Sequence, residues 1–451
     1  YDRFHAHADR IVRVTTSFGN KGPYATTPSL VAPVLTRTFP EVQRAVRIYD
    51  ATRYGPYVVR QGNRLFQEQR FFYADSTVFD VFSYDFLEGS PETALTRPNT
   101  VVLTASTARK YFGDGEALGQ TIVANNRTAF EVTGVIEDVP AASHMHFDFL
   151  ASLATLQSWS QLSDDAWRAA NFYTYLLLRE ADDAAALQEK IPALVQRLAE
   201  DPVRATAQFG LQPMTRIHLH SQVESEIEPN GDIRYVYIFA AVGLLILLVA
   251  CANYVNLTTA RAARRAREVA MRKALGAYRR QLARQFYAES ALLTGVALLL
   301  ALVLAEAALP LLNTISGKEL DLRYAAAPLV LFGGLGLGVS LLAGSYPALL
   351  LSGFQPAQVL KSGGVDPDGG GAAFRKGLVV LQFAISVFLM VGTAVVYNQL
   401  DYMQHQKLGF DKERVVVLSL GGDQQTYETA KRELMQEANV LSAAGSASLP
   451  R

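Results

Sequence analysis

Three His-x-His pairs are the residues whose types and spacing could most directly support chemistry: His5/His7, His144/His146 and His218/His220. On a β-strand, residues i and i+2 point to one face, so each pair could place two imidazoles on one metal ion. Glu224, Glu226 and Glu228 follow the third pair and could add carboxylates. The alternative is that the histidines lie in turns or interfaces. We favour this alternative, and we predict neither a metal nor a cofactor in this chain.

Motifs for catalysis are missing from the sequence. No G-x-x-x-x-G-K-[ST] loop for nucleotide phosphates is present, because Gly317-Lys318 is followed by Glu319. The sequence has no G-x-S-x-G nucleophile motif and no evident acid/base pair. We therefore predict no catalytic residue and a protein that is not an enzyme. The single cysteine, Cys251, excludes an intrachain disulfide and fits a small packing residue.

A cation-rich segment, residues 258–286, is the most distinctive charged feature. Its only acid is Glu268, and it carries nine cations: Arg261, Arg264, Arg265, Arg267, Arg272, Lys273, Arg279, Arg280 and Arg284. Apolar residues recur at intervals of 4, 3, 4 and 4, which predicts one face of an α-helix: Met271, Leu275, Tyr278, Leu282 and Phe286. Gly276 could end one helix so that the next begins at a new angle.

Three roles are open to this cationic segment. It could bind anionic lipids at the inner membrane surface. It could dock its apolar face in a groove of a partner protein. It could also do no more than fix the topology of the chain.

Four apolar stretches predict the elements that flank this segment. A helix needs about 20 apolar residues to cross the hydrocarbon core, and the stretches that qualify are 235–257, 287–315, 328–351 and 378–400. None has an ionisable residue near its middle. Soluble helices of this length normally show a polar stripe. We therefore predict four membrane spans. Gly334 and Gly338 form a G-x-x-x-G pair and predict close helix packing within a bundle or a dimer.

The rest of the composition indicates a second, soluble part. The chain has 451 residues and no formal net charge, which gives no support to nucleic-acid binding. Residues 1–234 mix short strands, such as 101–103 and 130–136, with helices such as 106–112 and 182–199. We predict an α+β extracytoplasmic domain followed by an α-helical transmembrane bundle.

The distribution of Lys and Arg predicts the orientation. The loop between the first and second spans is the cationic segment 258–286. The loop between the third and fourth spans, 352–377, carries Lys361, Arg375 and Lys376. Both loops are therefore expected in the cytoplasm. Residues 1–234 and 401–451 then lie outside. An outside domain of this size needs an earlier exporting segment, so we expect the chain to be a fragment of a longer protein.

Several stretches resemble FtsX/MacB-type ABC transporter permeases. Residues 267–277, R-E-V-A-M-R-K-A-L-G-A, resemble the coupling-helix signature of that family, with Ala270 where glycine is usual. The ends of the first and third spans and the entry to the fourth are also similar, at 250–257, 345–348 with 355–361, and 374–383. Residues 78–82, 108–114, 118–120 and 132–140 resemble, in order, a MacB-like periplasmic core domain.

This resemblance implies a division of the chain into five parts. They are a MacB-like periplasmic core domain (1–234), an FtsX-like permease domain with three spans (235–361), a cytoplasmic linker (362–377), the first span of a second repeat (378–400) and the start of a second periplasmic domain (401–451). The two-repeat form is similar to Bacteroidetes-type permeases. One histidine of each pair falls at a position that has no metal role in the family.

The resemblance also implies a function. The chain would be the permease subunit of an ABC transporter in the bacterial inner membrane, a dimer or pseudo-dimer of repeats among membrane lipids. A separate cytoplasmic ATPase would bind ATP-Mg and move the periplasmic domain, with export of a drug, peptide or lipoprotein and a periplasmic partner as further expectations. The residues that would dock the ATPase are Glu268, Arg272, Lys273, Leu275 and Gly276. The alternative is a membrane-anchored sensor or adhesion protein with no ATPase partner. The spans show no charged cavity that would identify a substrate.

Overall fold

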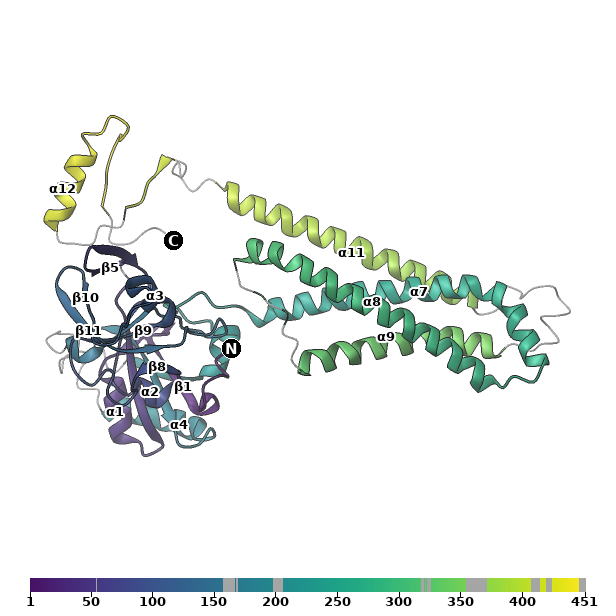
Figure 1. Cartoon of the computed structure of the whole chain (residues 1–451), viewed down its shortest axis with the longest axis horizontal. Helices are drawn as coiled ribbons and strands as arrows, with labels where there is room; N and C mark the ends of the chain where they lie inside the picture. The colour runs from purple at the N-terminus through teal and green to yellow at the C-terminus, as the bar shows by residue number, and fades with distance from the viewer. Residues whose placement is uncertain are drawn as a thin grey trace. The chain divides into compact units, whose positions relative to one another are not determined.

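The computed structural model describes residues 1–53, 55–156, 167, 169–197, 206–317, 320, 322, 326–353, 371–406, 414–418 and 424–445. These fall into two compact units. One unit comprises residues 1–233 with 413–451, and the other comprises residues 234–412. The first unit contains a β-sheet with short helices, and the second consists of long helices (Figure 1).

A mixed β-sheet is the framework of the first unit. Its strands are β1 (Ile11–Phe18), β2 (Lys21–Tyr24), β3 (Thr27–Pro28), β4 (Val42–Asp50), β5 (Tyr57–Gln61), β6 (Arg64–Glu68), β7 (Phe71–Ala74), β8 (Phe86–Gly89), β9 (Thr100–Thr104), β10 (Thr121–Ala124), β11 (Thr128–Ile136), β12 (Phe149–Ser152), β13 (Ala170–Leu178) and β14 (Ala207–Pro213). The order along the main path is β14-β1-β13-β4-β7-β12-β9-β11-β10-β5-β6. The pairs β7–β12 and β9–β11 are parallel, and the other neighbours on this path are antiparallel.

Helices lie between these strands along the chain: α1 (Val31–Thr38), α2 (Val78–Val81), α3 (Ala105–Phe112) and α4 (Asp183–Arg197). A further helix, α6 (Ile217–His220), follows β14. The strands predicted at 101–103 and 130–136 correspond to β9 and β11, and the helices predicted at 106–112 and 182–199 correspond to α3 and α4. The α+β fold of this part is therefore confirmed.

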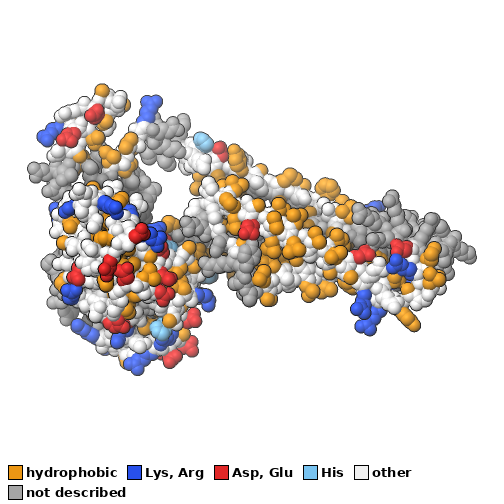
Figure 2. Space-filling view, viewed as in Figure 1, with side chains coloured by type: hydrophobic (Ala, Val, Ile, Leu, Met, Phe, Trp, Pro, Cys, Tyr) orange, Lys and Arg blue, Asp and Glu red, His pale blue; other side chains and the backbone are white. Residues whose placement is uncertain are grey.

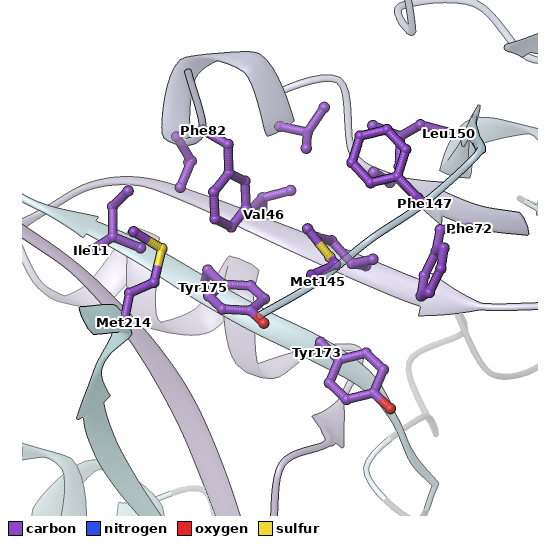
Figure 3. Packing of buried hydrophobic residues seen from close by; sticks show 14 of the residues in the cluster. Ile11, Val46, Phe72, Phe82, Met145, Phe147, Leu150, Tyr173, Tyr175 and Met214 are labelled. Carbon is purple, nitrogen blue, oxygen red and sulfur yellow. The ribbon is translucent and has the colours of Figure 1, made fainter. Parts of the chain in front are cut away.

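The strand β13 shows that the sheet is covered on both faces at this position. Its residues from Phe172 to Leu178 are all buried, a run without polar–apolar alternation that is typical of a strand covered on both sides. Tyr173 and Tyr175 join the cluster shown in Figure 3, while Leu176 and Leu178 pack in a different one. Alternate side chains thus serve two cores on opposite faces of the sheet.

Four long helices make up the second unit: α7 (Ile233–Ala274), α8 (Arg279–Ser316), α9 (Ala326–Gly353) and α11 (Gly371–His405). Among the described residues, three segments are long and apolar enough to cross a membrane: Ile233–Leu257, Arg279–Ser316 and Ala373–His405. In α9 the described apolar segment is shorter, Leu329–Leu341. Hydrophobic side chains cover the visible face of these helices (Figure 2). The predicted apolar helices after the α+β domain are therefore confirmed.

Helix boundaries differ from the predicted segments in two places. The first apolar segment ends at Leu257, as predicted, but the helix does not, because α7 continues without a break through the cationic segment to Ala274. The predicted linker 362–377 overlaps α11, whose first residues, 371–377, are helical. Ala372, Ala373, Arg375 and Lys376 favour helix, which explains the early start. Residues 362–370 lie outside the described residues. A further helix, α12 (Gln424–Leu434), belongs to the first unit.

Small residues set the contact between α8 and α9. A Cβ atom on Gly336 would lie 2.3 Å from Leu298 Cδ1, and one on Gly344 would lie 3.0 Å from Ser290 Oγ. Ser340, midway between them, is buried. Residues four apart share a helix face, so these three form a small-xxx-small stripe. A Cβ on Gly334 or Gly338 would meet nothing within 4 Å. Packing by that predicted pair, against another chain or repeat, stays a prediction.

The same substitution, made once in the 336/340/344 stripe and once in the Gly334/Gly338 pair, distinguishes which face of α9 packs against α8. We expect Gly336→Val to destabilise the helical unit by about 1–3 kcal/mol through overpacking. The same change at Gly334 has equal intrinsic helix propensity but open space, and we expect a negligible effect. Thermal unfolding of the detergent-solubilised chain measures the difference. Equal shifts for both variants would show that the 336/340/344 stripe does not set this contact.

Candidate functional site

The turn between α7 and α8 is the first candidate site, and we call residues 268–289 the elbow. Gly276 has φ +97°, a left-handed conformation that glycine adopts without strain. Its N–H donates to the Lys273 carbonyl and the Ala277 N–H donates to the Arg272 carbonyl, both at 3.0 Å. This pair of bonds is the Schellman motif that ends helices. The predicted interruption at Gly276 is confirmed.

The two arms of the elbow are joined by a polar ladder. Arg272 forms an ion pair of 2.7 Å with Glu268, one turn earlier on α7. Its Nη1 also donates to Gln285 Oε1 on α8, at 2.8 Å. Gln285 Nε2 then donates to Glu289 Oε1 at 3.2 Å. The ladder therefore ties the end of α7 to the first turns of α8.

An apolar cluster supports the same joint. Val269 of α7 packs with Leu282 and Phe286 of α8, and all three are buried. The predicted single apolar face from Met271 to Phe286 is therefore wrong. The turn at Gly276 divides it, so that Leu282 and Phe286 point into the joint while the three earlier residues remain exposed. Met271, Leu275 and Tyr278 are 60%, 84% and 75% exposed. We call these three the elbow tip.

The five residues predicted to dock an ATPase thus have different roles inside the chain. Glu268 and Arg272 belong to the ladder, and Gly276 forms the turn. Leu275 is the most exposed of the tip residues. Lys273 is partly exposed, and burial together with the neighbouring Arg279 guanidinium lowers the pKa of its ammonium group. All five lie in the elbow, but the structure does not test whether they contact an ATPase.

The histidine pairs do not form the strand arrangement that a shared metal ion would need. His5 and His7 precede a short 3-10 turn, His144 and His146 lie in the loop before β12, and His218 and His220 lie in α6. Within the described parts of the chain, no group of three or more His, Cys, Asp and Glu residues is placed to hold a metal ion.

Several of these histidines instead bond to polar groups of the domain. His144 Nδ1 lies 2.8 Å from Asp2 Oδ1, and its Nε2 lies 2.7 Å from the Tyr175 hydroxyl. Asp2, His144 and Tyr175 resemble a catalytic relay, but all three are buried, so no substrate reaches them. His5 Nδ1 accepts a bond of 3.1 Å from the Ser83 N–H.

A buried arginine was not predicted from the sequence. Arg13 lies on β1 with no exposed side-chain surface. Its guanidinium donates to both carboxylate oxygens of Glu226, to Gln212 Oε1 at 2.7 Å and to Ser221 Oγ at 3.1 Å. Burial alone would lower the pKa of Arg13, but the bonds to Glu226 outweigh it and the pKa is raised. Arginine inside the apolar run I-V-R-V signals a buried acidic partner, but it does not say which acid.

Comparisons with known proteins place the chain in a family. Residues 1–194 match the MacB-like periplasmic core domain, and residues 240–356 match the FtsX-like permease C-terminal domain. The chain belongs to the FtsX/MacB-like permeases. This permease is 23% identical over 266 residues to the macrolide export ATP-binding/permease protein MacB of Bdellovibrio bacteriovorus. That match covers 59% of the permease and 39% of the relative, so the chain spans less than half of that relative's length.

Two solved structures are similar to the permease over about half of its length. A domain assigned to a permease protein of Porphyromonas gingivalis is 23% identical and covers 50% of this chain and 95% of its own, with a TM-score of 0.41. The periplasmic region of MacB from Actinobacillus actinomycetemcomitans is 14% identical. The similarity covers 47% of this chain and 91% of that structure, with a TM-score of 0.35. The two matched domains and the long apolar helices, rather than these structures, show that the permease is a membrane protein with a MacB-like periplasmic core domain.

The buried His5 predicts a pH dependence of stability. Burial lowers the pKa of His5 from 6.5 to about 4. Between these two pKa values the unfolded chain binds more protons than the folded chain. The free energy of unfolding therefore decreases as the pH is lowered, by about 2 kcal/mol from pH 7 to pH 5. The pKa of Asp2 is also lowered, although burial opposes the bonds from His144, and its contribution is lost in a more acidic range.

Urea unfolding of the N-terminal domain within the solubilised chain, at pH 7, 6 and 5, measures this effect. We expect His5→Gln to reduce the loss of stability between pH 7 and 5, because glutamine does not titrate. A pH dependence that is unchanged in His5→Gln would contradict the assignment to His5.

Proposed function

We propose that this permease is the membrane subunit of an ABC transporter that crosses the bacterial inner membrane several times. An ATPase outside these 451 residues would bind ATP-Mg on the cytoplasmic side. Residues 1–234 and 401–451 would face the periplasm. The membership of the family and the absence of a phosphate-binding loop in the sequence support this proposal. The subunit itself would be non-catalytic.

The elbow tip is the observation that carries the proposal. Three large apolar side chains are exposed on one tight turn within a cation-rich segment. A loop that only fixed topology would need the cations but no exposed leucine, methionine and tyrosine. Apolar anchors that fill a pocket, within a charged surround, are typical of protein interfaces. We infer that the tip inserts into an ATPase groove and that Lys273 contributes charge at its rim.

The joint behind the tip supports mechanical coupling. The ladder and the Val269–Leu282–Phe286 cluster make the end of α7 and the start of α8 one packed body. Displacement of the turn would therefore move both helices together. The Tyr254 and Ser290 hydroxyls, 3.0 Å apart, also join α7 to α8, and the Gly336 stripe joins α8 to α9. We infer that ATP-driven movement of the ATPase reaches the periplasmic domain through these helices, for export of a drug, peptide or lipoprotein-type substrate.

Substitution at the tip tests docking. We expect Leu275→Asp to reduce co-purification of a P-loop ATPase with the full chain by at least about tenfold, because a buried unpaired carboxylate is costly at an interface. Leu65→Asp is the matched control, since Leu65 is also exposed but lies on β6 of the N-terminal domain. We expect Lys273→Glu to weaken the complex less than Leu275→Asp.

A ladder variant separates docking from coupling. We expect Arg272→Gln to keep the ATPase bound but to lower permease-stimulated ATP hydrolysis, because it loosens the joint and leaves the tip exposed. Absence of any P-loop ATPase from complexes of the unmodified chain would reject the proposal and favour a membrane-anchored sensor or adhesion protein.

A further inference from the structure

Residues 221–228, which we call the strap, connect the sheet domain to α7 along the chain. Only four residues separate Glu228 from Ile233, where α7 begins. The strap forms no helix and contributes only an isolated bridge between Glu224 and Tyr24. Any displacement at the start of α7 reaches the N-terminal domain through it along the covalent chain.

Backbone bonds hold the middle of the strap. The Ala25 N–H donates to the Glu224 carbonyl and the Glu224 N–H donates to the Pro23 carbonyl, both at 2.8 Å. The Tyr173 hydroxyl, from β13, donates to the Ser225 carbonyl at 3.1 Å. Val223 and Ile227 pack, partly buried, against the hydrophobic cluster that contains Tyr173. These contacts fix the path of the strap but could be replaced by water at modest cost.

Two carboxylates of the strap bond to charged or polar groups of the domain. The Glu226 carboxylate accepts hydrogen bonds from both terminal guanidinium nitrogens of Arg13 and from the Ser221 hydroxyl. Glu228 lies 2.9 Å from His146 Nδ1, and the bonds from His146 lower the pKa of Glu228 although burial opposes them. Both carboxylates therefore bind to the domain from the half of the strap nearest α7.

The Arg13 pair cannot open without leaving a charge inside the protein. Arg13 is fully buried, and without the strap its guanidinium would keep only Gln212 of the partners described above. A buried, uncompensated guanidinium is strongly disfavoured. The strap is thus held as part of the sheet domain rather than as a loose tether.

We propose that Arg13 and Glu226 are positioning residues that anchor the strap, so that displacement at the start of α7 is passed to β1 and the sheet. This inference rests on the mechanical coupling proposed above. The Arg13–Glu226 pair is the point at which displacement of α7 would enter the N-terminal domain. The position of β1 suits it to pass that displacement to the rest of the sheet. β1 lies inside the sheet order, hydrogen-bonded to both β13 and β14.

Thiol accessibility of the full chain tests the anchor. Ile227→Cys is placed in a Cys251→Ser background, which leaves one thiol, and its reaction with a maleimide is timed in membranes. We expect Glu226→Gln to accelerate labelling at residue 227 by about tenfold or more, since local opening governs the reaction of a partly buried thiol. Glu224→Gln is the matched control on the same strap, where an exposed side chain is changed, and we expect little effect.

A second reporter keeps the test decisive. Val46 is fully buried on β4. A cysteine placed there by Val46→Cys is expected to stay unlabelled in the Glu226→Gln variant. Unchanged labelling at residue 227 would overturn the proposal. Equal acceleration at residues 46 and 227 would also overturn it, because the pair would then hold the whole domain together rather than the strap.

The coupling readout separates a positioning role from a purely structural one. In the complex with the ATPase, we expect Glu226→Gln to keep the ATPase bound but to abolish the ATP-dependent change in labelling of a thiol on β1, such as Ser17→Cys. Persistence of that change would overturn the transmission role. Failure of the unmodified chain to bind any ATPase would reject the proposed function, and labelling at residue 227 would still decide whether the strap is anchored.

Discussion

A guanidinium with no exposed surface must find its counter-charge inside the protein, and in this chain the counter-charge is supplied from 213 residues away. Arg13 on β1 is paired with Glu226 of the strap. Desolvating both groups is costly, so the pair adds little net stability, but losing one partner would leave the other buried and unpaired. The segment that enters α7 is therefore fixed to a strand inside the sheet. In the proposed coupling, this pair would determine where displacement of α7 enters the domain.

A second constraint shapes the helical unit. In lipid every backbone polar group needs a partner within the chain, so spans are long unbroken helices and turns lie outside the hydrocarbon. Gly276 provides such a turn, with its Schellman bonds satisfying the carbonyls at the end of α7. Behind it, the ladder and the small apolar cluster keep the two arms packed. A turn that docks on a moving partner would require a rigidly packed joint and exposed apolar side chains at its tip.

Sequence patterns predicted the elements better than their contacts. Apolar runs located the long apolar helices, and glycine after a periodic helix located the turn at Gly276, because both signals are local. The partner of Arg13 was not predictable, since 42 acidic residues could supply the carboxylate and sequence separation carries no information on proximity. Gly334 and Gly338 fit a packing motif, yet α8 meets Gly336 and Gly344. A helix with several glycines presents several small faces, and only its rotation in the bundle selects one. The predicted apolar face from Met271 to Phe286 was wrong because the same Gly276 divides it.

Hydrogen–deuterium exchange of the complete complex, compared between nucleotide-free and ATP-trapped states, tests the central claim most directly. The account predicts altered exchange at the turn that carries the elbow tip, residues 271–278, and also at the strap and β1. It predicts little change at β5 and β6, which end the sheet order on the side away from β1. Altered exchange confined to the elbow, with the strap and β1 unchanged, would contradict the transmission of ATPase movement to the N-terminal domain.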